Sequence, residues 1–256
     1  MKYVIIGVEG PHDQAFTGKV LKLLGFKDFR EDLKGLKSSL DPFWRKFIPI
    51  YPKQGNLYKR LDMPSILFND TISVAIYAGE GSNLVTTLDD ILFNNPEYQT
   101  DLGAFGIVAD CDKSNPIQIV TKYSNCLQKY FPNFPNQAGE VDINIPRTGI
   151  YVLPDNASQG VLDTLLCSCG ETAYPVYMER ARSYLDKFSE EEMKSLKWKN
   201  FDCNKALLAT VVSVLKPGKT NTASIADNNW VSEETQQQVP ALAIFIEFLK
   251  QLLELS

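Results

Sequence analysis

Tyr3-Val4-Ile5-Ile6-Gly7-Val8-Glu9-Gly10-Pro11-His12-Asp13 places an apolar run directly before acidic residues. The run from Tyr3 to Val8 is typical of a buried strand, and Pro11 begins a segment with helical spacing that ends near Leu24. A strand followed directly by a helix is the repeating unit of parallel α/β sheets. The stretch therefore predicts an α/β fold, with Glu9 at the carboxyl end of the first strand.

Phe105-Gly106-Ile107-Val108-Ala109-Asp110-Cys111-Asp112 shows the same arrangement later in the chain. Ligands of parallel α/β sheets gather outside the carboxyl ends of the strands, so neighbouring strands would bring Glu9, Asp110 and Asp112 together. Crowded carboxylates repel one another and are costly to bury unless a cation joins them. Because oxygen ligands favour Mg²⁺ or Mn²⁺ over zinc or copper, these residues predict a magnesium or manganese site.

The rest of the chain alternates strand and helix and then becomes helical. Further strands are expected at residues 71–78 and 149–154, and helices at residues 84–93, 115–131, 160–168, 174–188, 202–215 and 240–253. Residues 26–69 read as an irregular insertion. We therefore predict an α/β core over residues 1–170 and a helical C-terminal portion, residues 171–256, packed on that core.

Composition excludes several classes of protein. Of 256 residues, 44% are apolar and 22% charged, which is ordinary for a globular protein. No apolar stretch reaches the roughly 18 residues of a membrane span, and no signal-peptide layout is present, so a cytoplasmic protein is expected. Five cysteines without a Cys-x-x-Cys pair, and a single histidine, His12, argue against a zinc ribbon, a disulfide framework and a Ser-His-Asp hydrolase.

The net charge of −5 hides a basic segment over residues 17–60, which carries +7 against −12 for the remainder. A local basic face can attract a polyanion even on an acidic protein. Aromatic residues within the segment could stack unpaired bases. The alternative is that lysine and arginine stems cover local apolar side chains, and the sequence leaves both interpretations open.

The acidic motifs resemble the Toprim domain of topoisomerases, bacterial primases, small RNA-maturing nucleases and the overcoming-lysogenization-defect (OLD) nucleases. The matching elements are Val8-Glu9-Gly10-Pro11-x-Asp13, Asp110-x-Asp112 and Leu153-Pro154-Asp155-Asn156. They are most similar to a group of uncharacterised bacterial Toprim-like proteins related to the OLD-type nucleases. The resemblance covers roughly residues 1 to 170 and implies a mostly parallel sheet flanked by helices.

The resemblance also implies roles for individual residues. Glu9, Asp110 and Asp112 would be the catalytic group and would hold the principal Mg²⁺ or Mn²⁺. Asp13, with Asp155 or Asp163, would help to hold a second ion. Asp163 departs from the related pattern, which more often has Glu, so the second ion is the weaker part of this expectation.

Several candidates have simpler structural explanations. Asp13 could be an ordinary first-turn acid, and Asp112 could cap the following helix. The loop Gly79-Glu80-Gly81-Ser82-Asn83 could hold a phosphate through its backbone or could be a tight turn. Lys205 could neutralise phosphate charge if the C-terminal helices fold back, or could be a solvated helix lysine.

The sequence thus favours a Mg²⁺-dependent phosphodiesterase, most plausibly a nuclease acting on DNA or RNA. A non-catalytic Toprim module that binds nucleic acid or a protein partner is the alternative. A phosphatase or glycosyltransferase using Asp110-x-Asp112 is less consistent with the late position of that motif. A separate ATPase is a possible partner, because the ATPase fused to OLD-type proteins is absent, and no membrane association is expected.

Overall fold

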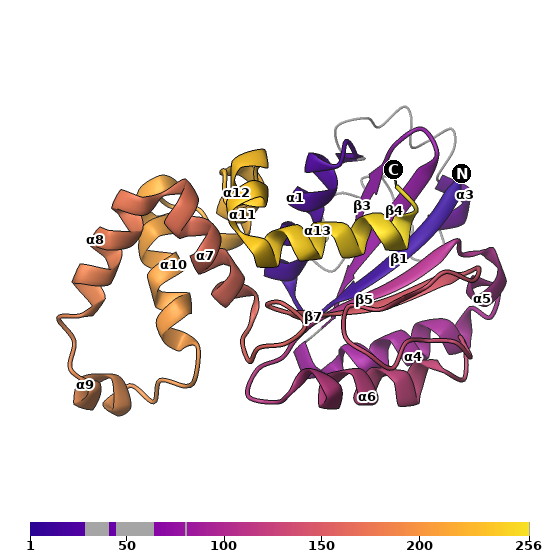
Figure 1. Ribbon diagram of the computed structural model, residues 1–256, viewed down its shortest axis with the longest axis horizontal. Coiled ribbons are helices and arrows are strands. Elements are labelled where there is room, and N and C mark those ends of the chain that lie inside the picture. Colours follow the sequence, from indigo (N-terminus) through magenta and orange to yellow (C-terminus); the bar gives the residue numbers. More distant parts are fainter. Residues whose placement is uncertain (29–40, 45–63, 80, 256) are drawn as a thin grey trace, which may run out of the picture.

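A computed structural model describes residues 1–28, 41–44, 64–79 and 81–255. Within these residues the centre is a seven-stranded sheet with the order β2-β3-β4-β1-β5-β7-β6 (Figure 1). The strands are β1 (Lys2–Val8), β2 (Lys27–Asp28), β3 (Ser65–Phe68), β4 (Ile72–Ala78), β5 (Ala104–Asp110), β6 (Val141–Asp142) and β7 (Arg147–Leu153). The central strands β4, β1, β5 and β7 run parallel, whereas β3 and β6 are antiparallel to their inner neighbours. The predicted α/β class with a mostly parallel sheet is confirmed.

The parallel strands end level with one another. Val8 of β1 lies opposite Ala78 of β4 and Val108 of β5. Asp110, the last residue of β5, lies opposite Leu153 of β7. This register brings the residues that follow β1 and β5 to one edge of the sheet.

Helices cover both faces of the sheet, as parallel sheets require. One face carries α1 (Pro11–Leu23), α7 (Leu162–Ala173) and α13 (Pro240–Leu253), and the other carries α4 (Leu84–Asn94) and α6 (Pro116–Leu127). The short helices α3 (Asp41–Trp44) and α5 (Tyr98–Asp101) lie near the amino ends of the central strands. Two apolar clusters, one on each face, therefore form the core.

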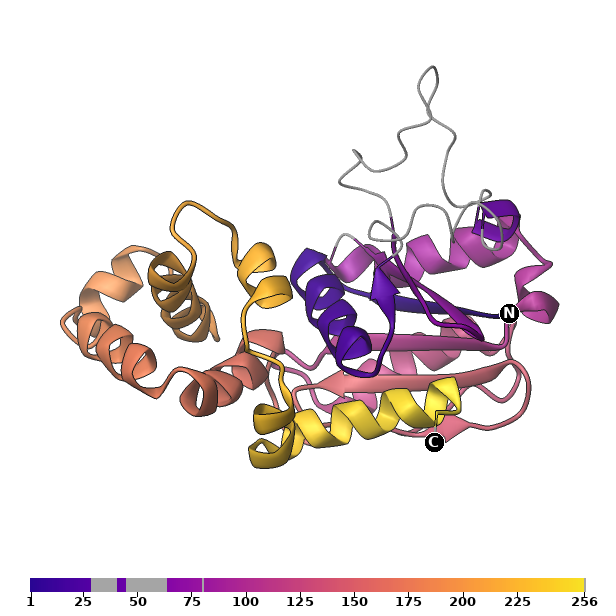
Figure 2. The same ribbon diagram turned by 90° about the horizontal axis from the view of Figure 1, so that it is seen from above.

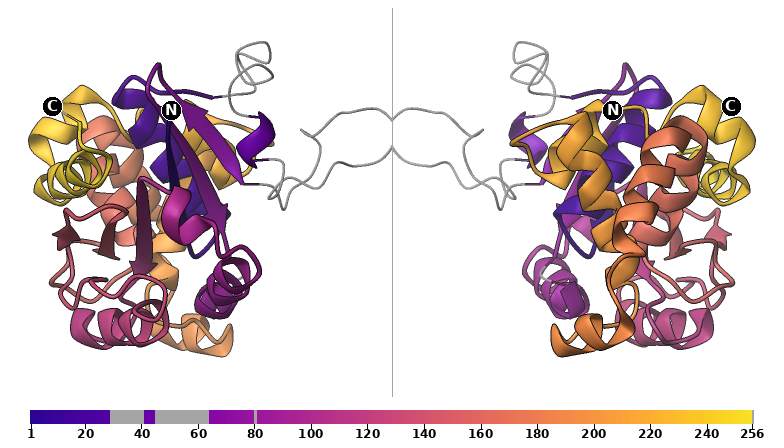
Figure 3. Two further views of the ribbon diagram at one scale, coloured as in Figure 1. Left: turned by 90° about the vertical axis from the view of Figure 1, so that its right-hand side faces the viewer. Right: turned by 90° about the vertical axis from the view of Figure 1, so that its left-hand side faces the viewer.

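A helical lobe extends beyond the carboxyl ends of the parallel strands. It consists of α8 (Pro175–Leu185), α9 (Glu190–Ser195) and α10 (Asp202–Leu215) and projects from the sheet in Figures 1 and 2. Figure 3 (right) looks along the molecule from the side of this lobe. The helices α11 (Asn221–Asp227) and α12 (Glu233–Gln238) then lead the chain back to the sheet.

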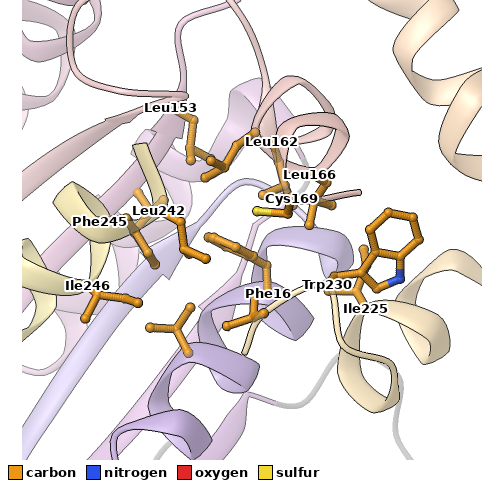
Figure 4. Packing of buried hydrophobic residues seen from close by; sticks show 14 of the residues in the cluster. Phe16, Leu153, Leu162, Leu166, Cys169, Ile225, Trp230, Leu242, Phe245 and Ile246 are labelled. Carbon is orange, nitrogen blue, oxygen red and sulfur yellow. The ribbon is translucent and has the colours of Figure 1, made fainter. Parts of the chain in front are cut away.

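The last helix of the chain belongs to the packing of the sheet. The ring of Phe245 in α13 lies 5.0 Å from that of Phe16 in α1 and 4.9 Å from that of Tyr151 in β7, between ring centroids. Figure 4 shows Phe16 and Phe245 in the same cluster as Leu162 of α7. Burial of each such side chain stabilises the fold by about 2 kcal/mol. The C-terminal portion therefore contributes to the core, and the predicted boundary at residue 170 falls inside α7.

The sequence predicted the long elements within a few residues of their observed bounds, and α10 and α13 at their observed bounds. Its description of residues 26–69 as irregular is wrong for β2, α3 and β3. These elements are too short to show a period, and pairing with β4 creates β3. Most of the predicted basic face, at residues 29–40 and 45–63, lies outside the described residues. The short helices α5, α9, α11 and α12 were also not predicted.

Candidate metal centre

The acidic residues lie where the strand order reverses. β1 is paired with both β4 and β5. The helix after β1 packs on one face of the sheet and the helix after β5 on the other. The connections after these two strands therefore diverge, which opens the crevice where α/β sheets bind ligands.

Asp110 ends β5 inside this crevice. Its Oδ1 accepts a hydrogen bond of 2.8 Å from the backbone N–H of Leu162, the first residue of α7. Burial, followed by the charges of Asp13 and Glu9, raises the pKa of the Asp110 carboxyl well above its usual range, against the effect of the Leu162 hydrogen bond. The helix terminus thus offsets only part of the cost of placing this charge here.

Glu9 directly follows β1 and faces the same crevice. Burial and the charge of Asp112 raise the pKa of Glu9 to about 7, while Lys122 and the backbone N–H of Asp110 act in the opposite direction. A carboxyl with this pKa exchanges its proton near neutral pH. Such a shift, combined with specific charged neighbours in a crevice, is typical of functional sites.

Asp13 has a structural and an electrostatic role at once. It occupies the first turn of α1, where one carboxylate oxygen accepts a 2.9 Å hydrogen bond from the N–H of Gly10. It is also buried, and burial followed by the charge of Glu9 raises its pKa. The predicted first-turn role is therefore observed, together with membership of the acidic group.

Asp112 adopts a left-handed backbone conformation, with φ of 51°. Its N–H donates a 2.8 Å hydrogen bond to the carbonyl of Gly160, which ties the loop after β5 to the loop before α7. The following helix, α6, is capped by Asn115, whose side chain accepts a hydrogen bond from the N–H of Gln118 at 2.9 Å. The alternative that Asp112 caps this helix is wrong, and its side chain lines the crevice instead.

Asp163 reaches the group from α7. It is buried, and burial raises the pKa of its carboxyl, while the charges of His12 and then Lys205 lower it. Its own charge contributes to the raised pKa of Asp13. Lys205 therefore acts on the group only through its charge, since its ammonium donates a hydrogen bond to Asp202 of its own helix, at 3.4 Å.

Asp155 is not joined to this group. Its Oδ1 accepts hydrogen bonds from the N–H groups of Ala157 and Ser158 at 3.0 and 2.7 Å, and its Oδ2 accepts one from the Ser158 hydroxyl at 2.8 Å. Burial acts to raise its pKa, but the hydrogen bonds hold the pKa below its usual range. Of the two second-ion candidates, Asp163 lies beside Asp13, and Asp155 stabilises a turn.

A pocket of about 470 Å³ adjoins the acidic residues. It is lined by Glu9, Asp110, Asp112, Ser114, Gln118, Ile119 and Lys122. Sequence reasoning missed the last four, although Ser114, Gln118 and Lys122 are spaced by four residues directly after Asp110-x-Asp112. Side chains with this spacing share one face of a helix, and that signal could have identified the wall of the pocket.

The phosphate-binding candidates differ in their surroundings. The N–H of Gly79 donates to the carbonyl of Val8 at 2.8 Å, and the N–H of Gly81 donates to the carbonyl of Glu9 at 3.0 Å. These two amides therefore tie the loop after β4 to the loop after β1, and hold the fold rather than a phosphate. Ser82 belongs to the 3-10 turn η2 (Gly81–Asn83).

The donor chemistry of the crevice fits a hard cation, because its ligands would be carboxylate oxygens. Within the described ranges, however, no three His, Cys, Asp or Glu side chains are arranged to hold a metal ion. Glu9, Asp110 and Asp112 would have to turn toward one another to share one. Relief of their mutual repulsion would favour that rearrangement.

A family model described as "Protein of unknown function (DUF3226)" matches residues 3–254. The chain belongs to the DUF3226 family. A search of curated proteins gives no match. The structure of this DUF3226 protein is similar to the crystal structure of hypothetical protein PH0156 from Pyrococcus horikoshii OT3, with a TM-score of 0.49 and 15% sequence identity, covering 100% of this chain and 96% of the other.

Proposed function

We propose that this DUF3226 protein is a Mg²⁺- or Mn²⁺-dependent phosphodiesterase, a nuclease acting on DNA or RNA. The observation that carries the proposal is that Glu9, directly after β1, and Asp110, at the end of the neighbouring strand β5, line one pocket with Asp112. The charge of Asp112 raises the pKa of Glu9, and the charge of Glu9 raises the pKa of Asp110. A fold has no packing reason to gather such acids at the edge of its sheet. The resemblance of the motifs to the Toprim domain supports the same function.

In the proposed mechanism Glu9, Asp110 and Asp112 would hold the principal cation, and Asp13 with Asp163 would help to hold a second. A bound cation of this kind activates water and neutralises charge on a phosphate. Alternatively, Glu9 is the acid–base group rather than a ligand, because in the absence of a cation its pKa of about 7 lets it take up or release a proton near neutral pH. Leu162 keeps the Asp110 carboxylate oriented through its N–H.

The test is incubation of the purified protein with single- and double-stranded DNA and RNA, in Mg²⁺, in Mn²⁺ and in chelator. Metal-dependent cleavage that is lost in Asp110→Asn is the expected result. Asp101→Asn is the matched control, because Asp101 is exposed in α5, away from the crevice. Intact substrate in every lane, or full cleavage by Asp110→Asn, would reject the proposal.

A second candidate is a non-catalytic module that binds nucleic acid or a protein partner through the same crevice. It is favoured by Asp163, a shorter acid than the Glu of the related pattern, whose charge is also partly offset by those of His12 and Lys205. Metal-dependent binding of an oligonucleotide without turnover would favour this candidate over the nuclease.

Nucleic acid is the partner of the proposed nuclease and one of the two possible partners of the binding module. A separate ATPase is a further partner that we propose from the resemblance. We also propose that the protein acts in the cytoplasm. None of the helices in the described ranges combines the length and apolar character that a membrane crossing requires.

A further inference from the structure

The pocket beside the acidic residues has two chemically different walls. Glu9, Asp110 and Asp112 form one wall, at the ends of β1 and β5. The other wall comes from α6 and the loop before it and carries Ser114, Gln118, Ile119 and Lys122. A ligand in this pocket would therefore meet acidic groups on one side and neutral and cationic donors on the other.

Lys122 is the cationic group of the α6 wall. Its charge acts on Glu9 across the pocket. Its ammonium lies 5.7 Å from the centroid of the Tyr123 ring, a range in which a cation is attracted to the ring face. Tyr123 is itself buried, so this contact steadies the lysine at the pocket. An ammonium with three N–H donors is well suited to phosphate oxygens.

The neighbouring positions extend this wall. Gln118 lies one helical turn before Lys122. Its Oε1 accepts a hydrogen bond from the N–H of Asn115 at 3.3 Å, and its amide N–H groups are the donors that it offers to a ligand. Ile119 adds an apolar contact, and Ser114 adds a hydroxyl near Asp112. Along the wall the Ser114 hydroxyl is thus followed by the Gln118 amide with the Ile119 side chain, and then by the Lys122 ammonium.

The size of the pocket limits what it can take. Its volume of about 470 Å³ lies within the range of small-molecule sites, roughly 300–1,000 Å³. One nucleotide fits such a volume, whereas a duplex does not. The acids alone would repel a phosphate, and a divalent cation on the acidic wall would reverse that repulsion.

We propose that the α6 wall binds a single nucleotide of a nucleic-acid strand, with Lys122 donating to its non-bridging phosphate oxygens and Gln118 and Ile119 contacting its sugar and base. The proposal deepens the proposed function and rests on it, because the cation on the acidic wall completes the phosphate site. Lys122 is then the residue that makes the pocket selective for phosphorylated ligands.

The experiment is isothermal titration of the full-length protein with thymidine 5′-monophosphate and with thymidine, each in Mg²⁺ and in chelator. In Mg²⁺ we expect the monophosphate to bind and Lys122→Met to bind it about tenfold more weakly, the loss typical of a hydrogen bond to a charged group. Thymidine should bind more weakly than the monophosphate and equally to both proteins. Lys122 is exposed, so its replacement should leave the fold intact.

Lys219→Met is the matched control, because Lys219 is also exposed and lies in the loop between α10 and α11, away from the pocket. Equal affinity of wild type and Lys122→Met for the monophosphate would overturn the inference. So would an equal loss in Lys219→Met, or failure of the wild type to bind the monophosphate in Mg²⁺.

A second readout separates this inference from the proposed function. Mg²⁺ should raise the melting temperature of Lys122→Met as it does that of the wild type, since the acidic wall is unchanged. If Mg²⁺ stabilises both proteins and Asp110-dependent cleavage proceeds with the same KM in both, only the α6 inference fails. If Mg²⁺ neither stabilises the wild type nor supports cleavage, the proposed function itself fails.

Discussion

Asp110 ends β5 and Asp155 follows the end of the neighbouring parallel strand β7 by two residues, yet their surroundings are opposite. Asp155 accepts three hydrogen bonds from its own turn, and its pKa is held below the usual range. Asp110 accepts one hydrogen bond, from Leu162, and burial with two acidic neighbours raises its pKa. The same residue type near the same edge of the sheet therefore stabilises the fold in one case and costs it free energy in the other.

Structural and functional acids in this molecule differ in whether neighbouring hydrogen-bond donors satisfy the carboxylate. A carboxylate that its own turn satisfies needs no ligand. Carboxylates that are buried together raise the free energy of the folded state when ionised, and such a cost is commonly retained at functional sites. By this criterion Glu9, Asp13 and Asp110 belong to the site, and Asp155 does not.

The largest expected effect is that of Asp110→Asn on cleavage. We expect metal-dependent cleavage to fall by at least about a hundredfold, the upper end of the loss for residues that only orient metal ligands. In chelator the same variant should unfold at higher urea concentration than the wild type, because Asn avoids the unfavourable ionisation of Asp110 in the folded state and its oxygen can still accept from Leu162. An active or destabilised variant would remove the contrast with Asp155.

The pH dependence of stability is the next largest effect. Since the pKa of Glu9 is raised from 4.5 to about 7, the folded state binds more protons than the unfolded state between these values. The free energy of unfolding in chelator should therefore fall as the pH rises from about 4.5 to about 7, on the order of 2 kcal/mol from this residue. Urea midpoints at pH 5 and pH 7.5 measure it.

Glu9→Gln is the control for this titration and should show a shallower decrease, because Gln does not ionise. Saturating Mg²⁺ should flatten the decrease in the wild type. A stability that rises over the same pH range would contradict the role given to the acidic group.

Asp155→Ala should have a smaller effect, and this effect should be on stability rather than on cleavage. Loss of its hydrogen bonds to Ala157 and Ser158 should lower the free energy of unfolding by about 1 kcal/mol, as loss of a helix cap does, without loss of cleavage. Asp155→Asn keeps an acceptor oxygen and should retain most of the stability. Chemical denaturation and the cleavage assay together measure both properties, and a cleavage defect in Asp155→Asn would return this residue to the site.

The smallest expected effect is that of Asp163→Asn. His12 and Lys205 offset part of its charge, so we expect cleavage to change less than about tenfold, below the usual loss for a supporting residue of a metal site. Cleavage titrated against Mg²⁺ concentration in both proteins checks this. A loss as large as that of Asp110→Asn would show that Asp163 is needed for the metal and would favour a second ion.

Much of the fold was predictable because its long elements carry their own patterns. The apolar runs of β1 and β5 and the spacing of α10 and α13 are local signals, and the structure has these elements where the sequence expects them. β3 gave no such signal, since four residues are too few for a period and its pairing with β4 is a long-range contact. The short helix α9 likewise shows its capping box, Ser189 with Glu192, only once its boundaries are known.

The candidate site divides in the same way. Glu9, Asp110 and Asp112 could be selected from the sequence because each stands at or after the end of a buried strand. Asp155 was selected on the same grounds, and the structure assigns it to a turn, because hydrogen bonds to Ala157 and Ser158 depend on the local path of the chain. Lys122 was missed because it lies far from Glu9 in the sequence, and only the folded chain brings both residues to the same pocket.

By itself the sequence determined which acids stand at strand ends and that oxygen ligands would suit a hard divalent cation, because residue type and local period carry that information. Only the tertiary structure decided that β1 and β5 are neighbours, that α7 adds Asp163 to the group, and that α6 supplies a wall with Lys122. Repulsion between carboxylates depends on their separation and burial, and both are set by strand order and helix packing rather than by any single stretch of the chain.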